Sequence, residues 1–94
     1  MDRATFEATL ASDGYEIVSI TMKSEQVNAE HVHPFDARVM VVDGAMTVDR
    51  EDTGARTFQS GESFELHAGC RHSETAGESG ATYVAGRRPP ANRR

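Results

Sequence analysis

Apolar and polar residues alternate along most of the chain after residue 14. A strand turns successive side chains to opposite faces, so a period of two predicts half-buried strands. The predicted strands are 15–22, 26–33, 37–43, 45–50, 56–59, 63–67, 70–75 and 81–86. Between them, Asp43-Gly44 predicts a hairpin turn, while 51–55 and 76–80 predict polar loops.

A single segment near the N-terminus has helical spacing instead. Phe6 and Leu10 lie four residues apart within 3–13, and Gly14 follows as a C-cap. Many short strands punctuated by glycine favour a sandwich or small barrel, because closure protects their edges. The pattern therefore predicts an all-β fold with a short N-terminal helix.

Length and composition limit the organisation of the chain. Its 94 residues suit one domain, predicted over 1–88, followed by a flexible basic tail at 89–94. A domain of this size has a small core, which favours self-association into a homodimer.

Charge and hydropathy exclude several classes of partner. The 15 acidic and 10 basic side chains give a net charge of -5, which disfavours binding to nucleic acid. No apolar run approaches the ~20 residues that span a bilayer, and the first residues lack the order of a signal peptide. We therefore expect a cytoplasmic protein with no membrane partner. Cys70 is the only cysteine, so no internal disulfide is possible.

Three of the four histidines have spacings that suit one site. His31 and His33 alternate along one predicted strand and so share a face, and His72 lies on a later strand. Three neutral imidazoles can hold a divalent metal on one side and leave the other coordination positions open. The sequence therefore predicts a site for a divalent transition metal, with iron, zinc, nickel, copper and manganese all open.

Two longer motifs include these histidines. The stretch "HVHPFDARVMVVDG" (31–44) resembles the first signature of the cupin superfamily, His-x-His followed by Glu and then Gly. The stretch "GESFELHAGCRHSETA" (61–76) resembles the second signature, with Gly61, Gly69 and His72 in register. The resemblance covers 31–76 and implies a small cupin, a jelly-roll or double-stranded β-helix barrel. It also implies that His31, His33 and His72 are metal ligands.

The chain departs from these signatures at the metal-binding glutamate. That position falls on Ala37, or on Arg38 if the loop is one residue longer, and neither side chain ligates a metal. Asp36 and Glu74 are the two candidates to replace the missing carboxylate. Arg38 is either a surface cation or, if the strand bulges, a residue that holds a substrate carboxylate.

Two residues are candidates for proton transfer. Glu74 lies two residues after His72 and shares its face, so it is a candidate general base, an orienting partner for an imidazole, or an exposed glutamate. His67 stands where the second signature has proline, and it is either a loop histidine, a further ligand or a proton shuttle.

These features lead to three functional hypotheses, of which the first is the main one. The first is a metal-binding cupin that acts on or binds a small organic molecule, in a dioxygenase-like reaction if it is an enzyme. The second is a non-catalytic cupin that binds or senses a small ligand, with or without metal. The third is a purely structural or dimerisation role. An enzyme that transfers protons needs Glu74 or His67, and a binding protein needs neither.

Overall fold

The computed structural model of the chain describes residues 1–90. It contains one helix and six strands: α1 (Arg3–Ser12), β1 (Glu16–Met22), β2 (Val27–His31), β3 (Asp36–Arg50), β4 (Gly54–Gln59), β5 (Ser63–Leu66) and β6 (His72–Arg88). The predicted all-β class with a short N-terminal helix is confirmed. Residues 91–94 of the predicted basic tail lie outside the described residues.

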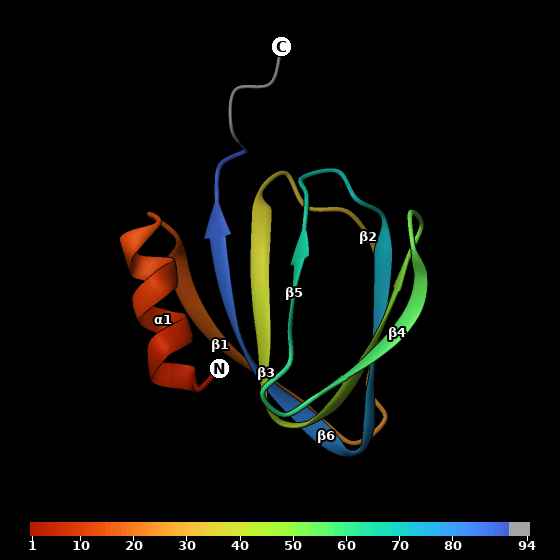
Figure 1. Cartoon of the computed structure of the whole chain (residues 1–94). Helices are drawn as coiled ribbons and strands as arrows, with labels where there is room; N and C mark the ends of the chain where they lie inside the picture. Colours follow the sequence, from red (N-terminus) through yellow and green to blue (C-terminus); the bar gives the residue numbers. More distant parts are fainter. Residues whose placement is uncertain (91–94) are drawn as a thin grey trace.

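Two long antiparallel strands, β3 and β6, run side by side and organise the whole sheet (Figure 1). The first part of β3 pairs with the last part of β6, and β5 and β1 extend this half of the sheet. The second part of β3 pairs with the first part of β6, and β4 and β2 extend the other half. The apolar core lies on the shared inner face, around Val39, Val41, Met46, Val48 and Tyr83.

Both long strands continue through the positions where the sequence predicted a turn and a loop. The hairpin turn predicted at Asp43-Gly44 is wrong, because β3 continues through it with register shifts on either side. The loop predicted at 76–80 is also wrong, since these residues belong to β6. Gly44 has φ +77, and a Cβ there would lie 2.1 Å from the carbonyl oxygen of Gly80. Glycine at this position therefore permits a close strand crossing and a bend rather than a chain reversal.

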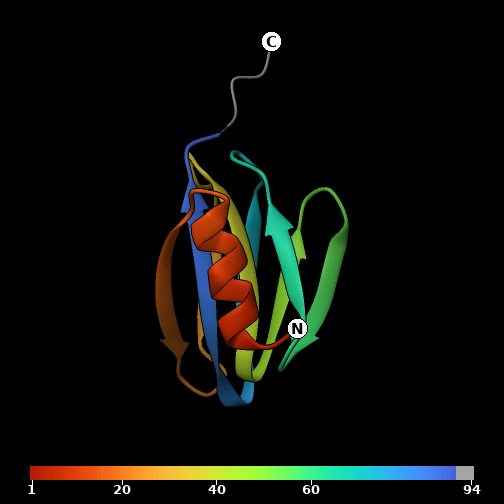
Figure 2. The same cartoon turned by 60° about the vertical axis from the view of Figure 1, so that its left-hand side comes forward.

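The helix α1 packs on the outer face of the sheet (Figure 2). Its N-terminus is capped by Asp2, whose Oδ1 accepts a hydrogen bond from the backbone N–H of Thr5 at 2.8 Å. Leu10 is fully buried against the strands, where Gly86 leaves room for its side chain. Within residues 1–90, no helix has the length and apolar character needed to cross a membrane.

Successive side chains of β3 and β6 point alternately to the inner core and to the outer face beneath α1. On β3, Ala37 and Val39 face the inner core, while Met40 contacts the outer cluster beneath α1. On β6, Tyr83 and Ala85 face inward in the same way. The inner face of this half of the sheet therefore forms one wall of the site described next.

Candidate metal centre

The segment that carries His31 and His33 is shorter as a strand than predicted. Strand β2 ends at His31, so His33 lies in the connection between β2 and β3. The turn after β5 holds this connection in place. The backbone N–H of Gly69 donates to the carbonyl of His33 at 2.9 Å, and the N–H of Ala68 donates to Asp36 Oδ1 at 2.8 Å. These two bonds place the start of β6, and with it His72, beside His33.

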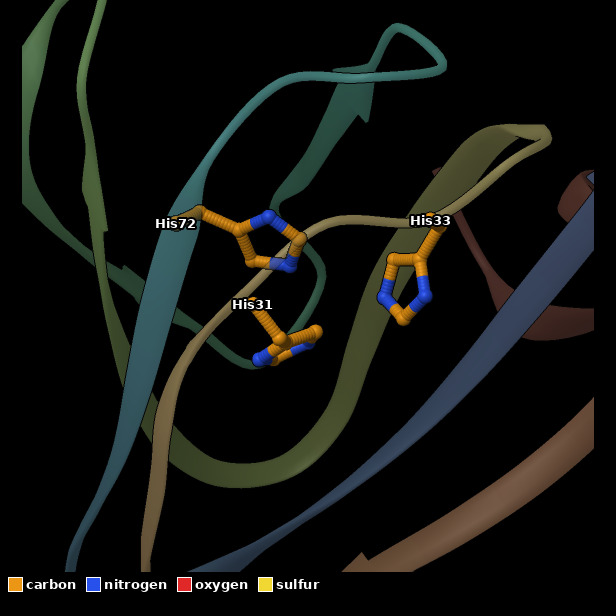
Figure 3. A group of neighbouring side chains, drawn as sticks. All are labelled: His31, His33 and His72. Atoms are coloured by element: carbon orange, nitrogen blue, oxygen red, sulfur yellow. The ribbon is translucent and has the colours of Figure 1, made fainter.

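The three imidazoles converge on one point (Figure 3). One nitrogen from each of His31, His33 and His72 lies within 4.8 Å of the others. The ring centroids of His31 and His72 are 4.4 Å apart, and those of His31 and His33 are 4.7 Å apart. The predicted clustering of the three histidines is therefore present in the folded chain, with His72 on β6 and the other two at the end of β2 and just beyond it.

Backbone carbonyls orient two of the three rings. Nδ1 of His31 lies 2.6 Å from the carbonyl oxygen of Ala29, and Nδ1 of His72 lies 3.0 Å from that of Cys70. Because a carbonyl oxygen can only accept, each Nδ1 carries a proton, and in the neutral ring each Nε2 keeps its lone pair. Metal-binding histidines are commonly fixed in this way by a hydrogen bond on the second nitrogen.

His72 has a buried ring nitrogen that lacks a hydrogen-bond partner within residues 1–90. Its side chain is only 1% exposed, and its Nε2 has no hydrogen-bond partner among the described residues. Buried polar atoms are nearly always paired, so an unpaired ring nitrogen in a cluster of histidines fits a metal ligand.

The third ring, that of His33, is held by stacking. The His33 ring stacks on Phe35 with centroids 4.7 Å apart and an interplanar angle of 20°. Burial lowers the pKa of His33, and the neighbouring imidazoles of His31 and His72 lower it further. A lowered pKa favours the neutral imidazole, which is the form that binds a metal.

A cavity of about 330 Å³ adjoins the histidines, between the two halves of the sheet. His31 and His33 line it together with apolar residues, namely Ile20, Phe35, Val39 and Leu66. Glu74 also faces this cavity and is only 7% exposed. Its Oε1 accepts a hydrogen bond from Asn28 Nδ2 at 3.1 Å and lies 3.9 Å from His31 Nε2. The chain therefore places one carboxylate beside the histidine cluster.

Three other residues considered from the sequence lie elsewhere. His67 is exposed and lines a separate groove next to α1, away from the three histidines. The Asp36 carboxylate binds the backbone of the turn after β5, as described above. Arg38 forms an ion pair with Asp13 at 2.8 Å, beneath the end of α1, which fits its interpretation as a surface cation. The structure therefore joins Glu74, but not these three residues, to the histidines.

Sequence reasoning missed four polar residues of the cavity, namely Gln26, Asn28, Tyr83 and Arg87. Tyr83 and Arg87 both lie on β6 and line the cavity with Glu74. Burial raises the pKa of Tyr83 to about 12. A signal existed in the alternation of 83, 85 and 87, which places all three on one face, but it did not show which face is inside.

Comparison with known proteins gives the fold its context. No protein-family profile matches the sequence, and no curated protein matches it either. Among solved structures, a cupin-2 domain protein from Shewanella frigidimarina is 21% identical, with a TM-score of 0.65 over 79% of this chain and 71% of that one. An RmlC-like cupin from the same organism is 20% identical, with a TM-score of 0.68 over 83% and 68%.

A third similar structure is an oxalate decarboxylase from Bacillus subtilis, which has Mn(II) centres. It is 18% identical to this chain, with a TM-score of 0.70. The match covers 87% of this chain and only 23% of the larger enzyme. The likeness to these three proteins is therefore a likeness of fold.

Proposed function

Given that this chain has the cupin fold, we propose that it binds one divalent transition metal through His31, His33 and His72 and acts on a small organic molecule in the adjoining cavity. The unpaired, buried Nε2 of His72 is the observation that carries this proposal. The tautomers of His31 and His72, both fixed by backbone carbonyls, support it further. The Mn(II) centres of the bacterial oxalate decarboxylase are consistent with a metal on this fold.

Three imidazole ligands do not select one metal. Three imidazoles suit iron, zinc, nickel, copper and manganese, so the ion is a matter for measurement. A metal at this site would supply Lewis acidity and, if it is redox-active, electrons for a dioxygenase-like reaction. The remaining steps belong to the chain's own residues.

Glu74 is the residue that we propose as the proton acceptor. Its carboxylate is buried in the cavity wall, and Asn28 fixes one of its oxygens. The apolar residues that line the same cavity, among them Phe35 and Leu66, reduce the access of water. A positioned carboxylate in such surroundings can take a proton from a bound molecule and return it later.

The Glu74→Gln variant tests this role, because it keeps the shape of the side chain and its hydrogen bond to Asn28. We expect the variant to retain metal within about twofold and to lose about 100-fold or more of the turnover, the usual contribution of a general base. The assay screens small oxygen-bearing molecules with iron-loaded protein, under air and under nitrogen. Turnover that is unchanged in Glu74→Gln would contradict the proposed role.

The same metal centre and cavity also suit a non-catalytic alternative. Of the two candidates for proton transfer, only Glu74 reaches the cavity, since His67 lines a different groove. A cupin that only binds or senses its ligand would show ligand binding in the wild type without turnover, and equal binding in Glu74→Gln. The same screen therefore separates an enzyme from a binding protein.

The homodimer and the cytoplasmic location stay predictions. A chain with so small a core benefits from burying further surface in a pair. The molar mass in solution, measured by sedimentation, tests the dimer directly: twice 10.2 kDa is expected.

A further inference from the structure

Arg87 lies in the same cavity as His31, His33 and Glu74. Its guanidinium group is 5.2 Å from the centroid of the Phe35 ring, which itself stacks on His33. Arg87 is exposed and also lines the cavity, so it stands where the cavity meets solvent. A cation at such an entrance is accessible to a molecule that approaches the histidines.

No carboxylate among residues 1–90 forms an ion pair with Arg87. Among the described residues, Arg38 pairs with Asp13 and Arg50 pairs with Asp52, whereas Arg56, like Arg87, lies over a phenylalanine ring without an ion pair. Glu16 is opposite Arg87 on β1, but it is exposed and makes no ion pair with it. The guanidinium donors of Arg87 are therefore available to a bound anion.

The neighbour of Arg87 on its other side is small. Ala37 is directly opposite Arg87 in the pairing of β3 with β6, and residues opposite each other in a sheet share a face. Both line the cavity, as does Ala85 two residues before Arg87. The small side chains of these two alanines leave room in the cavity that Arg87 also lines.

The charges of the cavity favour an anion once a metal is bound. Glu74 contributes one negative charge, and Arg87 and a divalent ion contribute three positive charges. A planar guanidinium binds a carboxylate with two parallel hydrogen bonds, a geometry that an ammonium group does not offer.

We propose that the molecule bound in the cavity is a small carboxylic acid, whose carboxylate pairs with Arg87 above Ala37 while the rest of the molecule faces the histidines. This inference rests on the proposed function, because it names the class of substrate for that site. A cavity of about 330 Å³ suits a small organic acid.

The test measures binding of propanoate and benzoate to zinc-loaded protein, by NMR titration in a buffer free of other carboxylates. Propanamide and benzamide serve as neutral controls of the same shape. We expect both acids to bind at least about tenfold more tightly than their amides, as charge-assisted hydrogen bonds require. The signals that shift should include those of Arg87, Phe35 and Ala37. Acids that bind no better than amides would overturn the inference.

Two variants assign the effect to Arg87. Arg87→Met should weaken acid binding at least about tenfold and leave the zinc content unchanged. Arg56→Met is the matched control, because Arg56 also lies over a phenylalanine, at 4.8 Å from the Phe58 centroid, but lines the groove beside α1. Equal acid binding in Arg87→Met and wild type would overturn the inference, even with full zinc.

A third variant tests the place of the carboxylate. Ala37→Val should fill the space beside Arg87 without adding a metal ligand, and should reduce acid binding while zinc is retained. If Ala37→Val binds acids as the wild type does, the carboxylate does not lie above Ala37. Wild-type protein that takes up no zinc would overturn the proposed function itself, and this outcome is distinct from the failure of acid binding in a zinc-loaded protein.

Discussion

The groove beside α1 is larger than the cavity at the histidines, but the smaller cavity is the one that adjoins an unpaired buried polar group. The groove measures about 790 Å³ and lies among α1, β4 and β5, whereas the cavity measures about 330 Å³. The groove contains the exposed His67 and three arginines, of which Arg38 and Arg50 are paired with carboxylates and Arg56 lies over the Phe58 ring. The cavity adjoins Nε2 of His72, a buried ring nitrogen with no hydrogen-bond partner among the described residues.

This difference shows why volume alone is a poor guide to function in a small protein. Polar groups that are satisfied by the chain itself contribute to the fold, as the Arg50–Asp52 pair does at 3.0 Å. Buried polar groups without a partner cost free energy, so a folded chain that keeps them has a use for them. By this criterion the buried Nε2 of His72, rather than the volume of either space, marks the candidate site.

The largest expected loss of stability comes from a substitution beneath α1, and it should leave metal binding unchanged. Leu10 is fully buried between α1 and the sheet, and Leu10→Ala should lower the free energy of unfolding by about 2–5 kcal/mol. Urea denaturation measures this loss, and Thr9→Ala, an exposed change on the same helix, serves as the control. We expect the metal content of folded Leu10→Ala to equal that of the wild type. A parallel loss of metal would show that the two regions are coupled.

The next effect is specific to the cavity. Metal at 100 times its dissociation constant should raise the free energy of unfolding by about 2.7 kcal/mol, because it binds only the folded chain. Thermal or urea unfolding with zinc and with a chelator measures this gain. Leu10→Ala should gain the same amount and His72→Ala almost none. An equal gain in His72→Ala would place the metal outside the cavity.

The smallest effect concerns pH. Burial raises the pKa of Tyr83 to about 12 from an ordinary value of 10.0. The folded chain thus prefers the neutral phenol, and the stability that this preference provides is present below pH 10 and is lost as the pH rises toward 12. Ultraviolet titration should show a late tyrosinate step that is absent in Tyr83→Phe and present in Tyr15→Phe. A late step that survives in Tyr83→Phe would contradict the burial of Tyr83 in the cavity wall.

The sequence predicted the histidine cluster because its positions follow short-range rules. His31 and His33 alternate, and the spacing of Gly61, Gly69 and His72 matches a known signature, so three residues far apart could be placed together. The end of β2 at His31 was missed, but the ring of His33 still reaches the cluster through its connection. Local sequence patterns were therefore enough to predict which three histidines cluster.

The features that the sequence did not predict depend on long-range pairing. Asp43-Gly44 has the composition of a hairpin turn, yet β3 continues through it because its partner β6 crosses closely at Gly80. The position of Arg87 likewise depends on the register that puts it opposite Ala37, fifty residues away in sequence. Pairing partners of this kind are fixed by the whole sheet, and no local pattern encodes them.

The most direct test of the metal centre is the metal content of purified, tag-free protein by mass spectrometry, beside His33→Ala, His72→Ala and His67→Ala. The wild type and His67→Ala should contain close to one divalent metal per chain, and the other two variants far less, with affinity about 100-fold lower or worse, since outer-shell changes alone cost 10–100-fold. Equal metal in all four proteins, or almost none in the wild type after reconstitution, would contradict a metal centre at His31, His33 and His72.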